Sequence, residues 1–212
     1  IRASARVLYN PNMADLIFVM PGLIAMLLQV LAVNTTAQSV VREHELGTME
    51  QILVTPLRPI ELVIGKLVPN LGLVILDQVV IVLLAVHWFG VPFQGSFWLF
   101  MWLAFMYVFS GLGLGLLLST ISQNQKQAHQ FAMLFMLLGL VLGGFIFPRY
   151  LMPPAIRVVG NLFPLTYFIP IARGIITKGI GIQHLWEQLA ALGIYVLAVM
   201  FVTARAFRRG LD

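Results

Sequence analysis

Long uncharged apolar runs alternate with short polar connections along this chain of 212 residues. A helix needs about 20 mostly apolar residues to cross about 30 Å of hydrocarbon. The runs that meet or approach this length are Leu16–Val41, Leu62–Phe89, Phe97–Ile121, His129–Phe147 and Leu185–Ala204. The pattern predicts an all-α integral membrane protein, a polytopic bundle of about five transmembrane helices.

Two connections are unusual. Arg42–Glu61 is polar and charged, and we expect Pro56 and Pro59 to stop any helix there. Between the fourth and fifth runs, Ala155–Ile176 is too apolar for an ordinary solvated loop, and Pro164 and Pro170 are expected to divide it. This second segment is predicted to form interfacial or re-entrant half-helices that pack against the bundle.

Composition agrees with a membrane protein. Hydrophobic residues make up 60% of the chain and charged residues 10%, whereas a soluble domain carries about a quarter charged residues. The net charge of +5 does not indicate a nucleic-acid partner, because the 13 basic residues are scattered and form no stripe. The chain has no cysteine, which excludes disulfides, thiol catalysis and Cys-ligated metals.

Orientation rests on the C-terminal tail. If Arg42–Glu61 is cytoplasmic, seven basic residues lie inside and six outside, which does not decide the topology. The run RAFRRGLD directly after the last span favours a cytoplasmic C-terminus, and five spans then put the N-terminal end outside. The chain begins at Ile1 with a polar stretch, so we expect a domain (residues 1–212) whose N-terminal part is missing.

The sequence contains no recognisable catalytic centre. Its four histidines lack a ligand spacing such as HExxH, and no GxSxG is present. Gly90–Gly95 has the glycine spacing of a Walker A loop, but Ser96 and Phe97 follow in place of the required Lys-Ser or Lys-Thr. We therefore predict no catalytic, metal-binding or cofactor-binding residues.

Polar side chains within the predicted spans are candidate pathway residues. Asp77 and Gln78 lie near the middle of the second run, and Gln29 and Asn34 lie in the first. A carboxylate inside a membrane costs about 3 kcal/mol on insertion scales, so it is by default a functional hypothesis. Asp77 either lines a substrate path or proton relay, or is buried and bonded to a polar neighbour such as Gln29 or Asn34.

Two GxxxG steps, Gly111/Gly115 and Gly139/Gly143, allow helices to approach closely. Packing within one subunit is favoured over a contact between two subunits.

The segment Arg42–Lys66 predicts an amphipathic helix. On a helical wheel its apolar arc holds Leu46, Met49, Ile52 and Leu53, and its polar side holds Glu43, His44, Glu50 and Gln51. Glu45 falls within the apolar arc, where it needs a partner or a contact outside the bundle. The helix either lies on the membrane surface or docks another protein.

Three stretches resemble ABC-2 type transporter permeases, in chain order. The first is Glu45-x-Gly47-Thr48-x-Glu50 with Thr55-Pro56 and Gly65-Lys66 after it. The second is Phe89-Gly90-Val91-Pro92, and the third is Asn161-Leu-Phe-Pro164-Leu-Thr166-Tyr167-Phe168 with Arg173-Gly174. The resemblance covers essentially the whole chain, and bacterial exporters of drugs or other hydrophobic compounds look most similar.

The resemblance implies a permease of six spans in the bacterial inner membrane, with the first span upstream of Ile1. It implies partnership with a cytoplasmic ATP-binding subunit, with a second permease copy or homologue, and in some assemblies with a periplasmic adaptor. The ATPase activity, and ATP with Mg²⁺, would then belong to the partner, and this chain would bind no cofactor of its own. The cargo would be a drug-like compound, a lipid or a glycan.

The resemblance also implies residue roles. Glu43, Glu45, Gly47, Thr48, Glu50, Thr55 and Pro56 would form the coupling region that meets the ATPase. Asn161, Pro164, Thr166, Tyr167 and Arg173 would belong to re-entrant helices that cap the pathway on the extracytoplasmic side. Replacing Glu50 with Lys or Gly47 with Val is expected to uncouple ATP hydrolysis from transport.

Two other classes remain open. A proton-coupled secondary transporter would use Asp77, but it would expect half-helices in both halves of an inverted repeat, and the sequence shows no such symmetry. The other class is a permease-like membrane anchor that is part of a fused ATPase. An ATPase gene beside or upstream of this one would favour the exporter.

Overall fold

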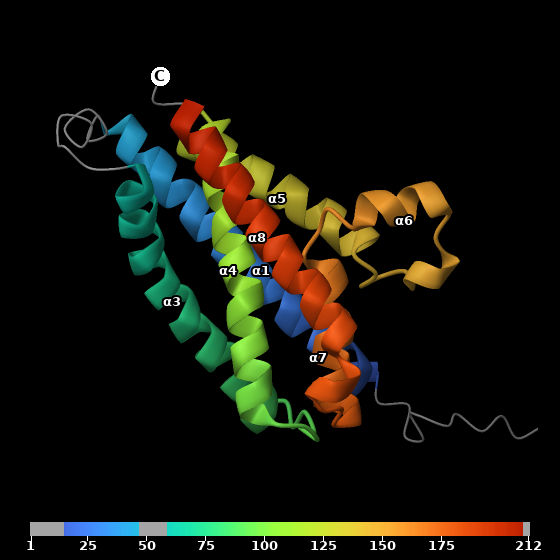
Figure 1. Ribbon diagram of the computed structural model, residues 1–212. Helices are drawn as coiled ribbons and strands as arrows, with labels where there is room; N and C mark the ends of the chain where they lie inside the picture. The colour runs from blue at the N-terminus through green and yellow to red at the C-terminus, as the bar shows by residue number, and fades with distance from the viewer. Residues whose placement is uncertain (1–14, 47–58, 210–212) are drawn as a thin grey trace, which may run out of the picture.

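The computed structural model describes residues 15–46 and 59–209, and within these ranges all regular secondary structure is helical (Figure 1). The α-helices are α1 (Asp15–Glu45), α3 (Pro59–His87), α4 (Phe97–Thr120), α5 (Gln125–Leu142), α6 (Pro154–Gly160), α7 (Leu165–Lys178) and α8 (Trp186–Arg209). Two short 3-10 helices, Arg149–Leu151 and Ile182–His184, precede α6 and α8. The predicted all-α class is confirmed.

In the described part of the chain, four helices are long and apolar enough to cross a membrane, in the segments Val19–Glu43, Val68–His87, Phe97–Thr120 and Trp186–Ala206. The pair α6 and α7, bent by 84°, makes a fifth if it is counted as one span. About five spans were predicted, but the run His129–Phe147 is not among the four. It falls largely within α5, an 18-residue helix whose first turns are the polar Gln125–Gln130.

The chain passes back and forth between two ends of the bundle (Figure 1). One end holds the last residues of α1, α4 and α8 and the first residues of α3 and α5; we call it the Glu45 end. The helices α5, α6 and α7 together lead from the Glu45 end to the opposite end, where α8 begins. The bent pair matches the half-helices expected over Ala155–Ile176.

Prolines end fewer helices than the sequence predicts. Pro59 does not stop a helix but begins α3, where the absent N–H of a first-turn residue costs nothing. Pro170 lies inside α7, and Pro21 and Pro69 lie inside α1 and α3. Among the described prolines that were predicted to break a helix, only Pro164 behaves as predicted, because it stands at the bend before α7. A long helix keeps its other backbone hydrogen bonds when one is lost, so it continues through the proline.

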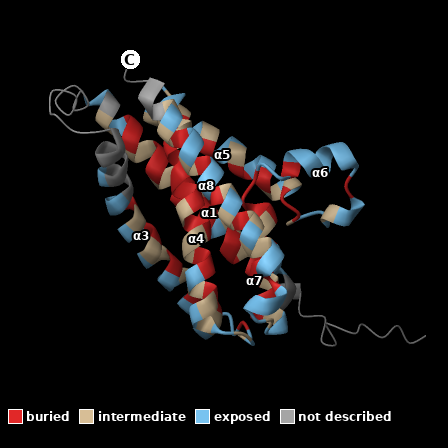
Figure 2. Ribbon diagram, in the orientation of Figure 1, coloured by how far each residue is buried: buried red, intermediate tan, exposed pale blue. Residues whose placement is uncertain are grey.

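The core forms where α1 packs against α4 and α7 and where α4 packs against α8. Figure 2 shows the buried positions running along α1 and α4 while the outward faces of the helices are exposed. Tyr107 of α4 stacks on Phe168 of α7 with ring centroids 4.1 Å apart, and its hydroxyl donates a hydrogen bond to the carbonyl of Ala25 in α1 at 3.0 Å. One fully buried aromatic residue thus joins three helices.

Glycines bring α4 close to α1. A Cβ atom at Gly111 would lie 2.8 Å from the Cβ of Ala32, and one at Gly115 would lie 2.5 Å from the carbonyl oxygen of Val33. Both distances are too short for a real side chain. The first GxxxG step therefore packs within one chain, as predicted. At Gly139, in the second step, a Cβ would lie 3.1 Å from the ring of Phe163, again in the same chain.

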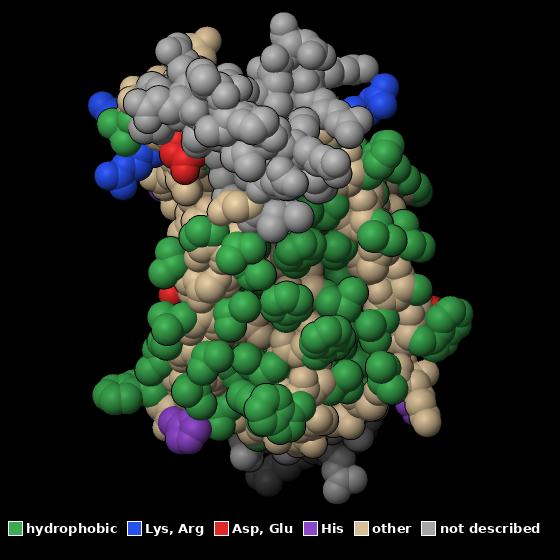
Figure 3. Space-filling model, turned by 60° about the vertical axis from the view of Figure 1, so that its left-hand side comes forward, with side chains coloured by type: hydrophobic (Ala, Val, Ile, Leu, Met, Phe, Trp, Pro, Cys, Tyr) green, Lys and Arg blue, Asp and Glu red, His purple; other side chains and the backbone are tan. Residues whose placement is uncertain are grey.

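The outer surface of the bundle is apolar. Figure 3 shows hydrophobic side chains covering the middle of one face, with the visible Lys and Arg side chains near one end. The helix α3 contributes exposed Leu73, Leu76, Val80, Leu83 and Leu84. Lipid tails are the surroundings that such a surface requires.

Candidate functional site

The Glu45 end contains a charged link between α1 and α5. The backbone N–H of Gln125 donates to Oε1 of Glu45 at 3.0 Å, and the Gln125 side-chain amide donates to Oε2 at 2.5 Å. These bonds, the side-chain bond first and the backbone bond second, lower the pKa of the Glu45 carboxyl below its usual range. Gln125 is the first residue of α5, so the carboxylate also sits at the positive end of a helix dipole.

The local sequence prepares this link. Asn124 caps α5 by accepting a hydrogen bond from the N–H of Gln127 at 2.8 Å, which leaves the N–H of Gln125 to point outward. The α1 helix continues as far as Glu45, so the polar segment after Val41 starts as an extension of a span and not as a loop. Glu45, which the sequence predicted to need a partner, finds it 80 residues along the chain.

The other predicted coupling residues are only partly visible. Glu43 lies on the same last turn of α1 and is half-buried. Gly47, Thr48, Glu50, Thr55 and Pro56 lie outside the described residues, as does the main part of the predicted amphipathic helix. Their roles stay predictions.

Polar residues meet between α1 and α5 inside the bundle. The side-chain oxygen of Asn34 accepts a hydrogen bond from the Gln38 amide at 2.8 Å and lies 2.9 Å from Nδ1 of His129, which donates in the tautomer protonated there. Sequence reasoning identified Asn34 but not its partners. His129 and Gln38 could have been found because they lie within predicted apolar runs, where a polar group usually has another polar group opposite it.

Gln29 and Gln78 are buried in different surroundings. Gln78 of α3 donates to the carbonyl of Met101 in α4 at 2.9 Å. Gln29 is 1% exposed and lies beside Gly111, and neither its amide oxygen nor its nitrogen has a hydrogen-bond partner among the described residues. Because an unpaired buried amide is costly, Gln29 is a site where a ligand or water would be stabilised.

Asp77 is isolated from these groups. It is half-buried on α3 and makes no hydrogen bond or ion pair with any described residue. Its nearest exposed neighbours on the helix are Leu73, Leu76 and Val80. The suggested pairing with Gln29 or Asn34 does not occur, because Asn34 is bonded to Gln38 and His129 and Gln29 has no described partner.

Four of the five predicted cap residues build the corner between α6 and α7. Asn161 ends α6, and its backbone carbonyl accepts a bond from the Tyr167 hydroxyl at 2.9 Å. Thr166 donates to the carbonyl of Gly160 at 2.5 Å, and Pro164 stands directly before α7. These contacts use backbone carbonyls that the bend leaves without helical partners. They hold the bend.

Arginines that sequence reasoning missed complete the corner. Nη2 of Arg149 donates to the side-chain oxygen of Asn161 at 2.6 Å and to the carbonyl of Arg157 at 2.9 Å. Arg157 donates to the carbonyl of Met152 at 3.2 Å. Arg173, the fifth predicted cap residue, is half-buried on α7, two turns from the bend. A usable signal was in the sequence, because no Asp or Glu lies between Gly143 and Trp186.

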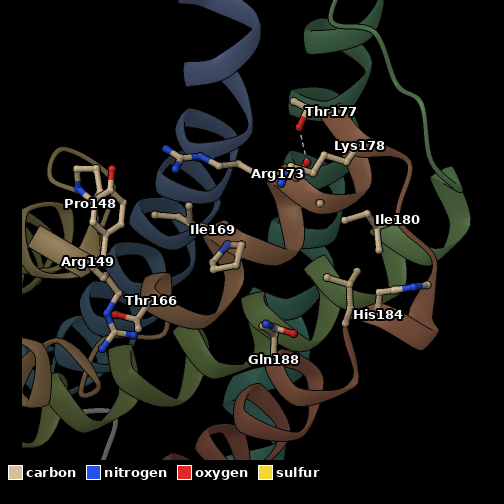
Figure 4. Close-up of a pocket in the computed structure, with 16 residues that line it drawn as sticks. Pro148, Arg149, Thr166, Ile169, Arg173, Thr177, Lys178, Ile180, His184 and Gln188 are labelled. Carbon is tan, nitrogen blue, oxygen red and sulfur yellow. Dashed lines mark hydrogen bonds between the residues drawn. The ribbon is translucent and has the colours of Figure 1, made fainter. Parts of the chain in front are cut away.

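A pocket of about 490 Å³ lies beside this corner, which we call the cap pocket. Its wall includes Gly144, Arg149, Thr166, Pro170, Arg173, Lys178, His184 and Gln188, from the end of α5, the first 3-10 helix, α7 and the start of α8 (Figure 4). In the described part of the chain no three His, Asp or Glu side chains gather into a group that could hold a metal.

Comparison with known proteins identifies the family. A model of the ABC-2 family transporter proteins matches residues 3–205. The probable multidrug ABC transporter permeases YbhR and YbhS of Escherichia coli are 32% and 34% identical to this chain, over 95% and 84% of it and over 55% and 48% of their own lengths. The inner membrane transport permease YhhJ of E. coli is 29% identical over 99% of this chain and 56% of its own.

The alignments cover most of this chain, but the chain spans only about half the length of these curated relatives. The predicted resemblance to ABC-2 permeases is confirmed by the family model, and the all-helical bundle with four to five candidate spans in the described residues is consistent with it. The chain is a multi-pass membrane protein that belongs to the ABC-2 family of transporters.

Proposed function

We propose that this chain is the membrane-spanning part of an ATP-driven exporter that moves a hydrophobic or amphiphilic compound out of the cytoplasm or the inner leaflet. The observation that carries the proposal is the family match over residues 3–205. The names of the relatives, two of which are called probable multidrug permeases and one an inner membrane permease, support the cargo class and a bacterial inner membrane location.

ATP hydrolysis takes place in an ABC ATP-binding subunit or domain at the Glu45 end, which is cytoplasmic. A second permease copy or homologue completes the pathway, and a periplasmic adaptor extends some of these assemblies. The basic residues Arg205, Arg208 and Arg209 after the last apolar run support this orientation. The chain itself supplies no catalytic group and binds no cofactor.

Coupling uses the link between Glu45 and Gln125. Closure of an ATP-binding dimer is a rigid-body movement, and the segment that follows Glu45 receives it. Because Glu45 joins the end of α1 to the start of α5, a displacement at this end moves both helices together. The polar contacts of Asn34 lie between the same two helices, so the movement reaches the candidate pathway.

The test is replacement of Glu45 by Ala in the full-length protein reconstituted with its ATP-binding partner. We expect ATP hydrolysis to continue while ATP-dependent dye transport falls severalfold, because the variant loses both hydrogen bonds that join the end of α1 to the start of α5. The matched control is Glu187→Ala, an exposed glutamate in the first turn of α8 at the opposite end, which should keep both activities.

Lowering the pH gives an independent check of the hydrogen bonds between Glu45 and Gln125. A carboxyl group whose pKa is lowered in the folded protein contributes its stabilisation above its usual pKa and loses it as the pH falls through the lowered value.

Transport that stays fully coupled in Glu45→Ala would refute the coupling role. A complete absence of ATP-dependent transport by the wild-type complex, for every hydrophobic dye tested, would refute the exporter itself.

A further inference from the structure

We propose that the cap pocket binds the phosphate-bearing head group of an anionic lipid. The site is separate from the link at the Glu45 end and from the Asn34 contacts. Binding there does not depend on the transport activity proposed above, because it is a property of the folded cap.

The first argument is charge. Between Gly143 and Trp186 the chain carries four Lys or Arg residues and no Asp or Glu. The fold brings three of the four, together with His184, to the wall of one pocket. These three are Arg149, Arg173 and Lys178. No carboxylate stands among the described lining residues beside Arg149 and Lys178, so these two residues give the pocket a positive potential that favours binding of an anion.

The second argument is the position of Arg149. Its side chain packs on Gly144, whose φ of +90° and lack of a Cβ make room for it; a Cβ there would lie 2.8 Å from Cγ of Arg149. Nη2 is engaged by carbonyl and amide oxygens, which fixes the plane of the guanidinium. Nε is buried and has no hydrogen-bond partner in the described part of the chain. A held guanidinium with a remaining donor is suited to a phosphate oxygen.

The partial burial of Arg149 also favours binding of an anion. Desolvation, and secondarily the neighbouring charge of Arg157, lower the pKa of Arg149, while Tyr167 acts in the opposite direction. A negative charge in the pocket would offset both unfavourable effects. Figure 4 shows further donors around the same space, with His184 and Gln188 on the side of α8 and Lys178 on α7; Arg173 extends toward α1.

The third argument separates a lipid from a soluble anion. Ile169, Pro170, Ile180 and Leu185 form the apolar part of the pocket wall. The neighbouring α6 segment exposes further apolar side chains, which are Ile156, Val158, Val159 and Leu162. Such a surface is suited to acyl chains, and the basic side chains beside it are suited to a phosphate-bearing head group.

The experiment measures binding of phosphatidylglycerol to the purified full-length protein by native mass spectrometry, with phosphatidylcholine as the comparison. Phosphatidylcholine carries the same phosphate with a quaternary ammonium, which a pocket lined without acids does not pair. We expect selective binding of phosphatidylglycerol, weakened about tenfold or more by Arg149→Gln. The matched control is Arg205→Gln, an exposed arginine at the Glu45 end.

A second pair of variants keeps the test decisive if Arg149→Gln misfolds. Lys178 and Lys126 are both exposed, at opposite ends of the bundle, so Lys178→Gln should weaken binding and Lys126→Gln should not. Equal binding of the two lipids, or wild-type binding by both Arg149→Gln and Lys178→Gln, would overturn the proposal. Displacement of the lipid by excess inorganic phosphate would also overturn it, because the site would then be one for a free anion.

Discussion

Two spans of nearly equal length and mean hydropathy, α3 and α4, have opposite places in the molecule. In the most apolar window of each helix, 61% of the positions of α4 are buried but only 28% of those of α3. The difference lies in small residues. In α4, Gly111 and Gly115 meet α1 directly, whereas Gly65 and Gly72 of α3 have no atom within 4 Å of where a Cβ would stand. Hydropathy identifies a span, but backbone approach decides which span becomes the centre of the bundle.

Replacing Gly115 with Val should produce the largest effect. The new side chain would meet the Val33 carbonyl and the Cβ of Thr36, so α4 must move away from α1. Overpacking of this kind costs about 1–3 kcal/mol, and we expect a corresponding loss of thermal stability in detergent. Gly72→Val on α3 is the matched control and should change stability by no more than about 0.5 kcal/mol. Equal losses in both variants would break the comparison.

Tyr107→Phe should have an intermediate effect on the same measurement. It keeps the stacking on Phe168 but removes the hydrogen bond to Ala25. The expected cost is about 0.5–1.5 kcal/mol, because the bond is neutral and the carbonyl remains within a helix. Tyr150→Phe, at a residue that is 77% exposed, serves as the control. A larger loss at Tyr150 would show that burial in α4 does not determine the cost.

Asp77→Asn on α3 should have the smallest effect. Asp77 contacts no described polar group, so removing its charge should leave protein level and ATP-dependent transport unchanged. The measurement is dye transport by the reconstituted complex with and without a proton gradient. Loss of transport in this variant would revive the proton-coupled alternative and would make α3 a functional span. The neighbouring Gln78→Leu, which breaks the bond to Met101, is a useful comparison because it faces α4.

Much of the fold was accessible from apolar runs. Four of the five predicted spans match spanning helices, and the apolar connection Ala155–Ile176 was correctly expected to form half-helices. The errors concern helix ends and prolines. Pro59 begins a helix and Pro170 lies within one, since a proline excludes only one backbone hydrogen bond and its position within the helix decides the outcome.

The site was less accessible because its contacts join distant parts of the chain. That Glu45 needs a partner followed from its place on a helical wheel, yet the partner Gln125 could not be named. The sequence also could not show that Asp77 is isolated or that Asn34 pairs with His129. Both depend on which faces of α1, α3 and α5 meet.

The sequence by itself determined that this protein is a membrane-embedded helical bundle of the ABC-2 family, because hydrocarbon thickness sets the length of a span and the motifs occur in order. Only the tertiary structure decided that α1 and α4 pack together at the centre of the bundle, that Glu45 joins α1 to α5, and that basic residues of an acid-free segment lie in the wall of one pocket. The physical reason is that burial, hydrogen bonding and the local field depend on how helix faces meet in space.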